Sequence, residues 1–126
     1  MLQYVWNAEY GYDSCHYCME PLETAQASVN RLTNDPNILL PHSECCTTRP
    51  GFHTRCPDCG VDFCSAGCRD EAWNKWHKVL CLGDQPLDLG HPFIKLTEDW
   101  KHMHYPPETV SIILFARILV SAIRFN

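Results

Sequence analysis

The hydrophobic and polar positions of the chain predict short helices and very little sheet. Between Glu20 and Leu32 the apolar residues follow one another at intervals of three and four, which is typical of one face of an amphipathic helix. A helix is also predicted over residues 66–80. Two more are predicted over residues 92–104 and 107–125, each with a proline that suits a first helical turn. Only residues 61–63 predict a strand, and it is brief.

Prolines and glycines interrupt these patterns at two places. Residues 38–55 contain Pro41 and Pro50-Gly51 and have no clear period, so we expect a loop that is ordered only if other parts of the chain hold it. Residues 82–91 also lack a period and predict a linker.

The last predicted helix is the most apolar part of the chain. Apolar residues occupy most of its faces, so we expect it to be buried. Ser111, Arg117, Ser121 and Arg124 interrupt it, which makes it too short and too polar to span a bilayer. The sequence therefore predicts no membrane partner.

Length and cysteine content change this picture of a few small helices. With 126 residues the chain has room for one small domain, or for a compact module with a helical segment, and such a core is small. Its nine cysteines are crowded between residues 15 and 81, as closely spaced pairs with an interleaved histidine. This spacing is typical of thiolate metal ligands rather than of a disulfide framework. We therefore expect a reducing compartment, the nucleus or the cytoplasm.

Eight of these residues have the spacing of paired zinc ligands. The pairs are Cys15 and Cys18, Cys56 and Cys59, Cys64 and Cys68, and His77 and Cys81. A Cys-x-x-Cys turn brings two sulfurs to one metal, and ligands at i and i+4 share one face of a helix. We therefore predict two structural Zn²⁺ ions, each with four protein ligands and no open position for a substrate.

Zinc binding would also change the charge of the chain. The formal charge is −5, and two Zn²⁺ add four positive charges while seven thiolates add seven negative ones, which gives −8. This balance disfavours non-specific binding to nucleic acid.

The long segment after the first pair leaves an alternative open. Thirty-seven residues separate Cys18 from Cys56. Cys45 and Cys46 lie in this insertion, together with His42 and His53. One of the two thiols could replace a ligand of the first pair or help to bind a third metal. Adjacent cysteines do not readily form an ordinary disulfide with each other.

The order of the ligand pairs resembles the MYND zinc finger of the SET-and-MYND family of protein-lysine methyltransferases. Runs outside the ligands extend the resemblance over almost the whole chain: residues 3–10, 40–42, 63–66 and 104–109. Most of the family has seven residues between the counterparts of Cys68 and His77, whereas this chain has eight, which is typical of the branch of its fifth member.

The resemblance implies a fold, a ligand assignment and domain boundaries. It implies a small zinc-stabilised α+β module with two cross-braced zinc sites, followed by α-helices. Alternate pairs share a metal, so the first site has Cys15, Cys18, Cys64 and Cys68, and the second has Cys56, Cys59, His77 and Cys81. Residues 1–14 would end the N-terminal SET piece, 15–81 form the zinc finger with an insertion at 19–55, 82–91 form the linker, and 92–126 begin the helical SET insert.

The family's activity implies S-adenosylmethionine-dependent methylation of lysines in histones and other proteins. Two elements of that catalytic machinery are missing here, because no Asn is followed by His and no Gly-x-Gly occurs. We therefore expect no catalytic or cofactor-binding residues and no activity in the chain alone. We expect it to be a truncated piece whose partner is the rest of the SET domain.

Two other functions remain as alternatives. A stand-alone MYND adaptor would bind proline-rich peptides, and the resemblance implies that an aromatic residue on the ligand helix, here Trp73, lines the groove for them. Trp76 is expected to pack against the zinc site. A RING-type ubiquitin-ligase module needs a central Cys-x-His pair, and neither Cys56 nor Cys59 has a histidine two positions later.

Overall fold

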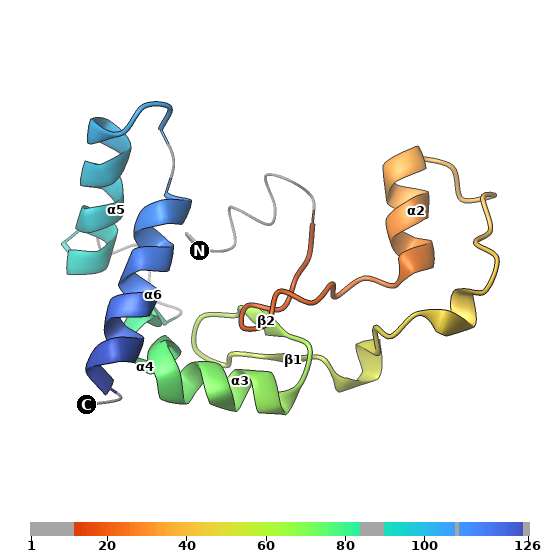
Figure 1. Ribbon diagram of the computed structural model, residues 1–126, viewed down its shortest axis with the longest axis horizontal. Helices are drawn as coiled ribbons and strands as arrows, with labels where there is room; N and C mark the ends of the chain where they lie inside the picture. The colour runs from red at the N-terminus through yellow and green to blue at the C-terminus, as the bar shows by residue number, and fades with distance from the viewer. Residues whose placement is uncertain (1–11, 84–89, 108, 125–126) are drawn as a thin grey trace. The chain divides into compact units, whose positions relative to one another are not determined.

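The computed structural model describes residues 12–83, 90–107 and 109–124 (Figure 1). These residues form two compact units. Of the described residues, one unit comprises 12–57 and 61–71, and the other comprises 58–60, 72–83, 90–107 and 109–124. None of the helices in the described ranges is long and apolar enough to cross a membrane.

A two-stranded antiparallel sheet organises the first unit. Strands β1 (Thr54–Arg55) and β2 (Asp62–Phe63) pair with Thr54 opposite Phe63 and Arg55 opposite Asp62. Phe63 is fully buried, and its ring packs edge-on against His16, with 5.9 Å between the ring centroids. The backbone N–H of His16 donates to the carbonyl of Asp62 at 3.0 Å. The loop that carries the first cysteine pair is therefore attached to the edge of the sheet.

The insertion forms helix α2 (Ala25–Thr33) and two 3₁₀ turns, η1 (Ser43–Cys45) and η2 (Pro50–Phe52). Thr24 caps the start of α2 by accepting a hydrogen bond from Ala27 N–H, and Asn34 ends the helix in the left-handed conformation. No residue of α2 is buried.

Polar contacts rather than a core hold the insertion loop. The side-chain amide of Gln26 donates to the carbonyl of Ile38 at 2.7 Å and accepts from Leu40 N–H at 2.8 Å. The sulfur of Cys46 accepts from Ala25 N–H at 3.4 Å, beside the start of α2. These hydrogen bonds hold the loop in place. They join residues that are far apart in the chain, so the periodicity of residues 38–55 did not predict them.

The helix predicted over residues 66–80 consists of three consecutive segments. These are α3 (Ala66–Ala72), a single π-helical turn η3 (Trp73–His77) and α4 (Lys78–Leu80). Ser65 caps the start, because its hydroxyl accepts from Cys68 N–H at 3.2 Å. In the π turn the N–H of Lys78 reaches back to the carbonyl of Trp73.

The second unit is helical and includes α5 (Pro92–Met103) and α6 (Val110–Arg124), which lie side by side (Figure 1). His91 caps α5, and Pro92 stands in its first turn, where its missing N–H costs nothing. Helix α6 contacts η3 as well as α5. The expected burial of α6 is found on one face only, which carries Ile112, Ile113 and Ala116.

The predicted fold class, a small zinc-suited α+β module followed by helices, is confirmed. The elements differ from the predicted ones mainly at their starts, since α2 begins at Ala25 rather than near Glu20 and α6 begins at Val110 rather than at Pro107. β1 was not predicted, because Thr54 and Arg55 have no alternation of their own and form a strand only by pairing with β2. Residues 84–89 of the expected linker 82–91 and residues 1–11 of the expected SET segment 1–14 lie outside the described residues.

Candidate metal centre

Two loops with the same hydrogen bond present the two Cys-x-x-Cys pairs. The N–H of Cys15 donates to the carbonyl of Glu20 at 2.8 Å, and the N–H of Cys56 donates to the carbonyl of Val61 at 2.9 Å. In each loop the bond runs from the first cysteine to the residue five positions later, and it closes a tight turn that carries both sulfurs. The two loops are therefore two copies of one metal-binding knuckle.

The knuckles differ at the residue that follows the second cysteine. Both residues have a left-handed backbone, with φ of 74° at Gly60 and 66° at Met19. A β-carbon at Gly60 would have no other atom within 4 Å, so only the backbone conformation favours glycine there. A methionine in this conformation is strained by about 1–2 kcal/mol. The first knuckle is consequently the more strained of the two.

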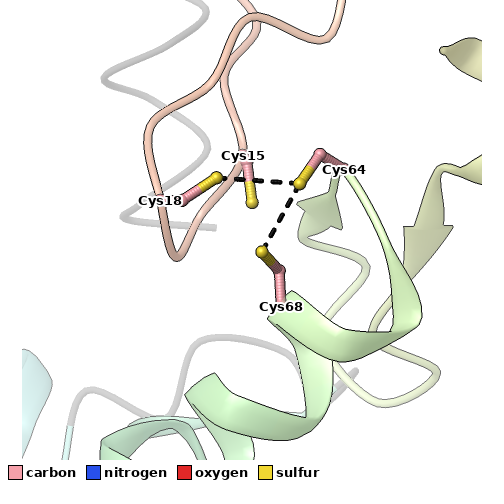
Figure 2. Close-up of side chains that lie close together, drawn as sticks. All are labelled: Cys15, Cys18, Cys64 and Cys68. Atoms are coloured by element: carbon pink, nitrogen blue, oxygen red, sulfur yellow. Dashed lines mark hydrogen bonds between the residues drawn. The ribbon is translucent and has the colours of Figure 1, made fainter. Parts of the chain in front are cut away.

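The first cluster consists of Cys15 and Cys18 from the first knuckle, Cys64 after β2, and Cys68 on α3 (Figure 2). The sulfur of Cys64 lies 3.6 Å from that of Cys18 and 3.4 Å from that of Cys68. All four sulfurs lie within 4.8 Å of one another. These separations are far longer than a disulfide bond of about 2.05 Å.

The first cluster fits a tetrahedral metal. Zinc–sulfur bonds of about 2.3 Å at tetrahedral angles place the sulfurs about 3.8 Å apart. The measured separations of 3.4 and 3.6 Å are close to that value. A set of four cysteine sulfurs is also a donor set that zinc prefers.

The second cluster consists of Cys56 and Cys59 from the second knuckle, together with His77 and Cys81. One ligand atom from each lies within 4.8 Å of the others, and the Nε2 atom of His77 is 3.5 Å from the sulfur of Cys59. Tetrahedral zinc with one imidazole and three thiolates requires a separation of about 3.6 Å between such atoms. The donor set and the spacing therefore both suit zinc.

The π turn explains how His77 reaches this position despite the eight residues between it and Cys68. A π turn contains one residue more than an α turn. The helix therefore accommodates an extra residue, and the segment after the turn keeps its orientation about the helix axis. The turn spans Trp73–His77 and so ends on the ligand itself. Helix α4 then places Cys81, whose N–H donates to the carbonyl of His77 at 2.7 Å, one turn further on.

Aromatic and cationic side chains enclose His77. The Trp76 ring packs edge-on against the imidazole at 5.5 Å, and the guanidinium of Arg117 lies 4.3 Å from the centroid of Trp76. Burial lowers the pKa of His77, and the positive charge of Arg117 lowers it further. Burial also lowers the pKa of Arg117, to about 10. A lowered pKa keeps the imidazole neutral, and a neutral imidazole is the form that binds metal.

Burial, neighbouring sulfurs and backbone N–H groups shift the pKa values of three thiols in the first cluster. Burial raises the pKa of Cys64, and the sulfurs of Cys68 and Cys18 raise it further. Burial also gives a net rise in the pKa of Cys18, whereas backbone N–H groups outweigh burial at Cys15 and lower its pKa. Burial and neighbouring sulfurs thus oppose ionisation of Cys64. A bound metal reverses this effect, since a coordinating thiol is deprotonated.

The candidate extra ligands take no part in either cluster of the described residues. Cys45 and His42 are exposed, and His42 pairs with Glu44 at 3.0 Å. The Cys46 sulfur contacts the backbone at the start of α2, and backbone N–H groups of Ala25 and Thr48 lower its pKa.

The sequence did not predict the contact of Arg117 with Trp76 beside the second cluster. The sequence feature that could have indicated this contact is the position of Arg117, a charged residue in the middle of the most apolar helix.

Exchanging residues at the matching knuckle positions tests the strain in the first knuckle. Met19→Gly should raise the free energy of unfolding by up to about 1 kcal/mol, because relief of the left-handed strain exceeds the added chain entropy. Gly60→Ala should lower it by about 1–2 kcal/mol for the opposite reason. Both are measured by denaturant unfolding of the zinc-loaded chain. A loss of stability in Met19→Gly would contradict the comparison of the knuckles.

The zinc content of cysteine variants tests the ligand assignment. Native mass spectrometry should detect two zinc ions in the unaltered chain and one in Cys15→Ser, because three ligands hold zinc poorly. Cys46→Ser is the matched control and should retain both ions. Loss of an ion in the Cys46 variant alone would transfer the first site to the insertion.

Known proteins of one name from several vertebrates are similar in sequence to this chain. The chain is 47% identical over 119 residues to the "Protein-lysine N-trimethyltransferase SMYD5" of Gallus gallus and 47% identical to that of Homo sapiens, and in both cases the match covers 94% of this chain and 28% of the relative. The Danio rerio protein of the same name is 44% identical over the same share of the chain and 29% of its own length. No family model and no solved structure matches the chain.

The chain thus spans less than a third of the length of the curated relatives that it matches. The match includes nearly all of its residues, and its two clusters combine the ligand pairs in alternation, as the resemblance implies. The family resemblance inferred from the sequence is therefore confirmed: over almost its whole length, the chain is similar to one segment of the SMYD5 proteins.

Proposed function

We propose that the chain is the zinc-binding MYND module, with adjoining helices, of a SET-and-MYND protein-lysine methyltransferase. One observation supports this most strongly: two four-ligand clusters suited to zinc occur in a chain that is 47% identical to a protein-lysine trimethyltransferase. In this proposal residues 15–81 form the zinc finger and residues 92–126 begin the helical insert.

The two zinc ions are structural in this proposal. Each cluster supplies four protein ligands, which leaves no coordination position for a substrate or a reactive water. Structural zinc contributes about 10 kcal/mol or more to the folding of small domains. The buried hydrophobic core here is small and includes few large side chains, among them Phe63 and Trp76. Removal of the metal should therefore unfold the module.

The rest of a SET domain is the proposed neighbour of α6. The face of α6 opposite Ile112 and Ile113 is apolar and exposed, with 54% exposure at Leu114 and 57% at Ile118. Phe115 and Leu119 are also exposed and lie on the adjoining side of the helix. A contiguous apolar stripe of this kind is typical of a surface that another protein segment covers.

The activity of the complete protein is the transfer of methyl groups from S-adenosylmethionine to lysines of histones or other proteins, in the nucleus or the cytoplasm. The module described here acts as scaffold and interaction surface for that chemistry. It supplies no catalytic or cofactor-binding residue of its own.

A chimera tests this proposal. The 119 matched residues replace the corresponding segment of the Homo sapiens relative, and transfer of labelled methyl groups to histones is measured. We expect the chimera to retain activity and the same chimera with Cys56→Ser to lose at least about tenfold, because a damaged metal site disturbs the fold around it. The isolated chain should transfer no methyl groups. Turnover by the chain alone, or full activity in the Cys56 variant, would refute the proposal.

A stand-alone adaptor for proline-rich peptides is the second candidate, and the exposure of Trp73 favours it. Trp73 is 36% exposed, whereas the neighbouring Trp76 is 6% exposed and packs against His77 and Arg117. A half-exposed tryptophan is the kind of side chain that proline-rich ligands contact.

Peptide binding by a Trp73 variant tests the adaptor function. If Trp73 contacts the peptide, Trp73→Ala should weaken the Kd of a proline-rich peptide by about tenfold or more, as is usual for a central aromatic contact. Phe52→Ala, which removes another exposed aromatic residue, is the control and should leave the Kd unchanged. Binding is measured by isothermal titration calorimetry with the zinc-loaded chain. Equal Kd values for both variants would exclude Trp73 as the contact.

A further inference from the structure

The first unit contains an open cavity of about 310 Å³ beside the first metal cluster. The insertion supplies one wall, with Thr47, Thr48 and Arg49, and the segment after β2 supplies another, with Cys64 and Ser65. The hydroxyl of Thr48 donates to the carbonyl of Pro21 at 3.4 Å, which ties the insertion to the end of the first knuckle. The volume lies at the lower end of the range for small-molecule sites.

Cys64 belongs both to the wall of this cavity and to the first cluster. Dashed lines in Figure 2 join its sulfur to the sulfurs of Cys18 and Cys68, and the two distances are 3.6 and 3.4 Å. Cys18 is exposed, whereas Cys56 and His77 of the second cluster are 2% and 1% exposed. A small molecule in the cavity therefore lies next to a ligand of the more accessible site.

The cavity also carries one unpaired side chain of each charge. Arg49 and Glu20 both line it and are exposed, and neither forms an ion pair within the described part of the chain. Guanidinium groups bind carboxylates, and carboxylates bind ammonium groups. The hydroxyls of Thr47 and Ser65 add further hydrogen-bonding groups.

We propose that this cavity admits a small thiol with an α-amino acid group to the first zinc site and thereby controls exchange of that zinc. The inference rests on the proposed zinc loading of the module. Arg49 binds the carboxylate of the thiol, and Glu20 binds its ammonium group. Cys15, Cys18, Cys64 and Cys68 would hold the zinc, and Cys64 would be the ligand that the incoming thiol replaces, with the proton of that thiol passing to the Cys64 sulfur. No oxidant or reductant is needed, because one zinc–sulfur bond replaces another.

Zinc release from the zinc-loaded chain tests this inference. L-Cysteine, 3-mercaptopropionate and 2-mercaptoethanol are added in turn, and the freed zinc is followed with a chromophoric indicator. Arg49→Gln should slow release by L-cysteine and by mercaptopropionate about two- to fivefold, the effect expected of a solvent-screened charge, and should leave release by mercaptoethanol unchanged. Glu20→Gln should slow only release by L-cysteine. Lys95→Gln removes the same charge as Arg49→Gln from an exposed position outside the cavity and should change nothing.

Two further measurements test the inference without changing a charged residue. Thr47→Trp should obstruct the cavity and slow release by all three thiols. Alkylation followed by mass spectrometry should label Cys64 and Cys18 before Cys56 and Cys59. Equal rates for Arg49→Gln and Lys95→Gln, no effect of Thr47→Trp, or earlier labelling of Cys56 would each overturn the inference. Fewer than two zinc ions in the untreated chain would contradict the proposed function, and the inference with it.

Discussion

The convergence of eight metal-binding side chains at two points is the constraint on which the rest of the structure depends. Each cluster holds four ligand atoms within 4.8 Å of one another, at separations close to those of tetrahedral zinc. Thiols at this distance oppose one another's ionisation, as the raised pKa of Cys64 indicates. A bound cation would favour the ionised thiols. The two-stranded sheet and the few buried apolar residues could not hold it alone.

The two sites bring four ligands together with different backbone conformations. Both knuckles close with the same hydrogen bond, but the left-handed residue is Met19 in one and Gly60 in the other. The second site adds a π turn that ends on His77, so an extra helical residue is taken up without loss of the ligand face. Trp76 and Arg117 then enclose the imidazole. The second site is thus well supported by its surroundings, whereas the first is strained and more open.

This difference extends to the surroundings of the two sites. The first site includes the exposed Cys18 and lies beside the cavity that Cys64 lines. In the second cluster Cys56 and His77 are buried, and the partly exposed Trp73 ring lies 6.0 Å from the His77 ring.

The sequence alone determined the ligand pairs and the family resemblance, because both depend on residue types at short, characteristic spacings. It also located most helices, since their apolar periodicity and capping residues are local. Tertiary structure decided the rest. The strand β1 exists only by pairing with β2, and the insertion is held by Gln26 through bonds to residues 12 and 14 positions away. The same holds for the left-handed backbone at Met19, the pairing of Arg117 with Trp76 and the cavity beside Cys64. These features depend on contacts between residues far apart in the chain, and no periodicity in a single sequence records such contacts.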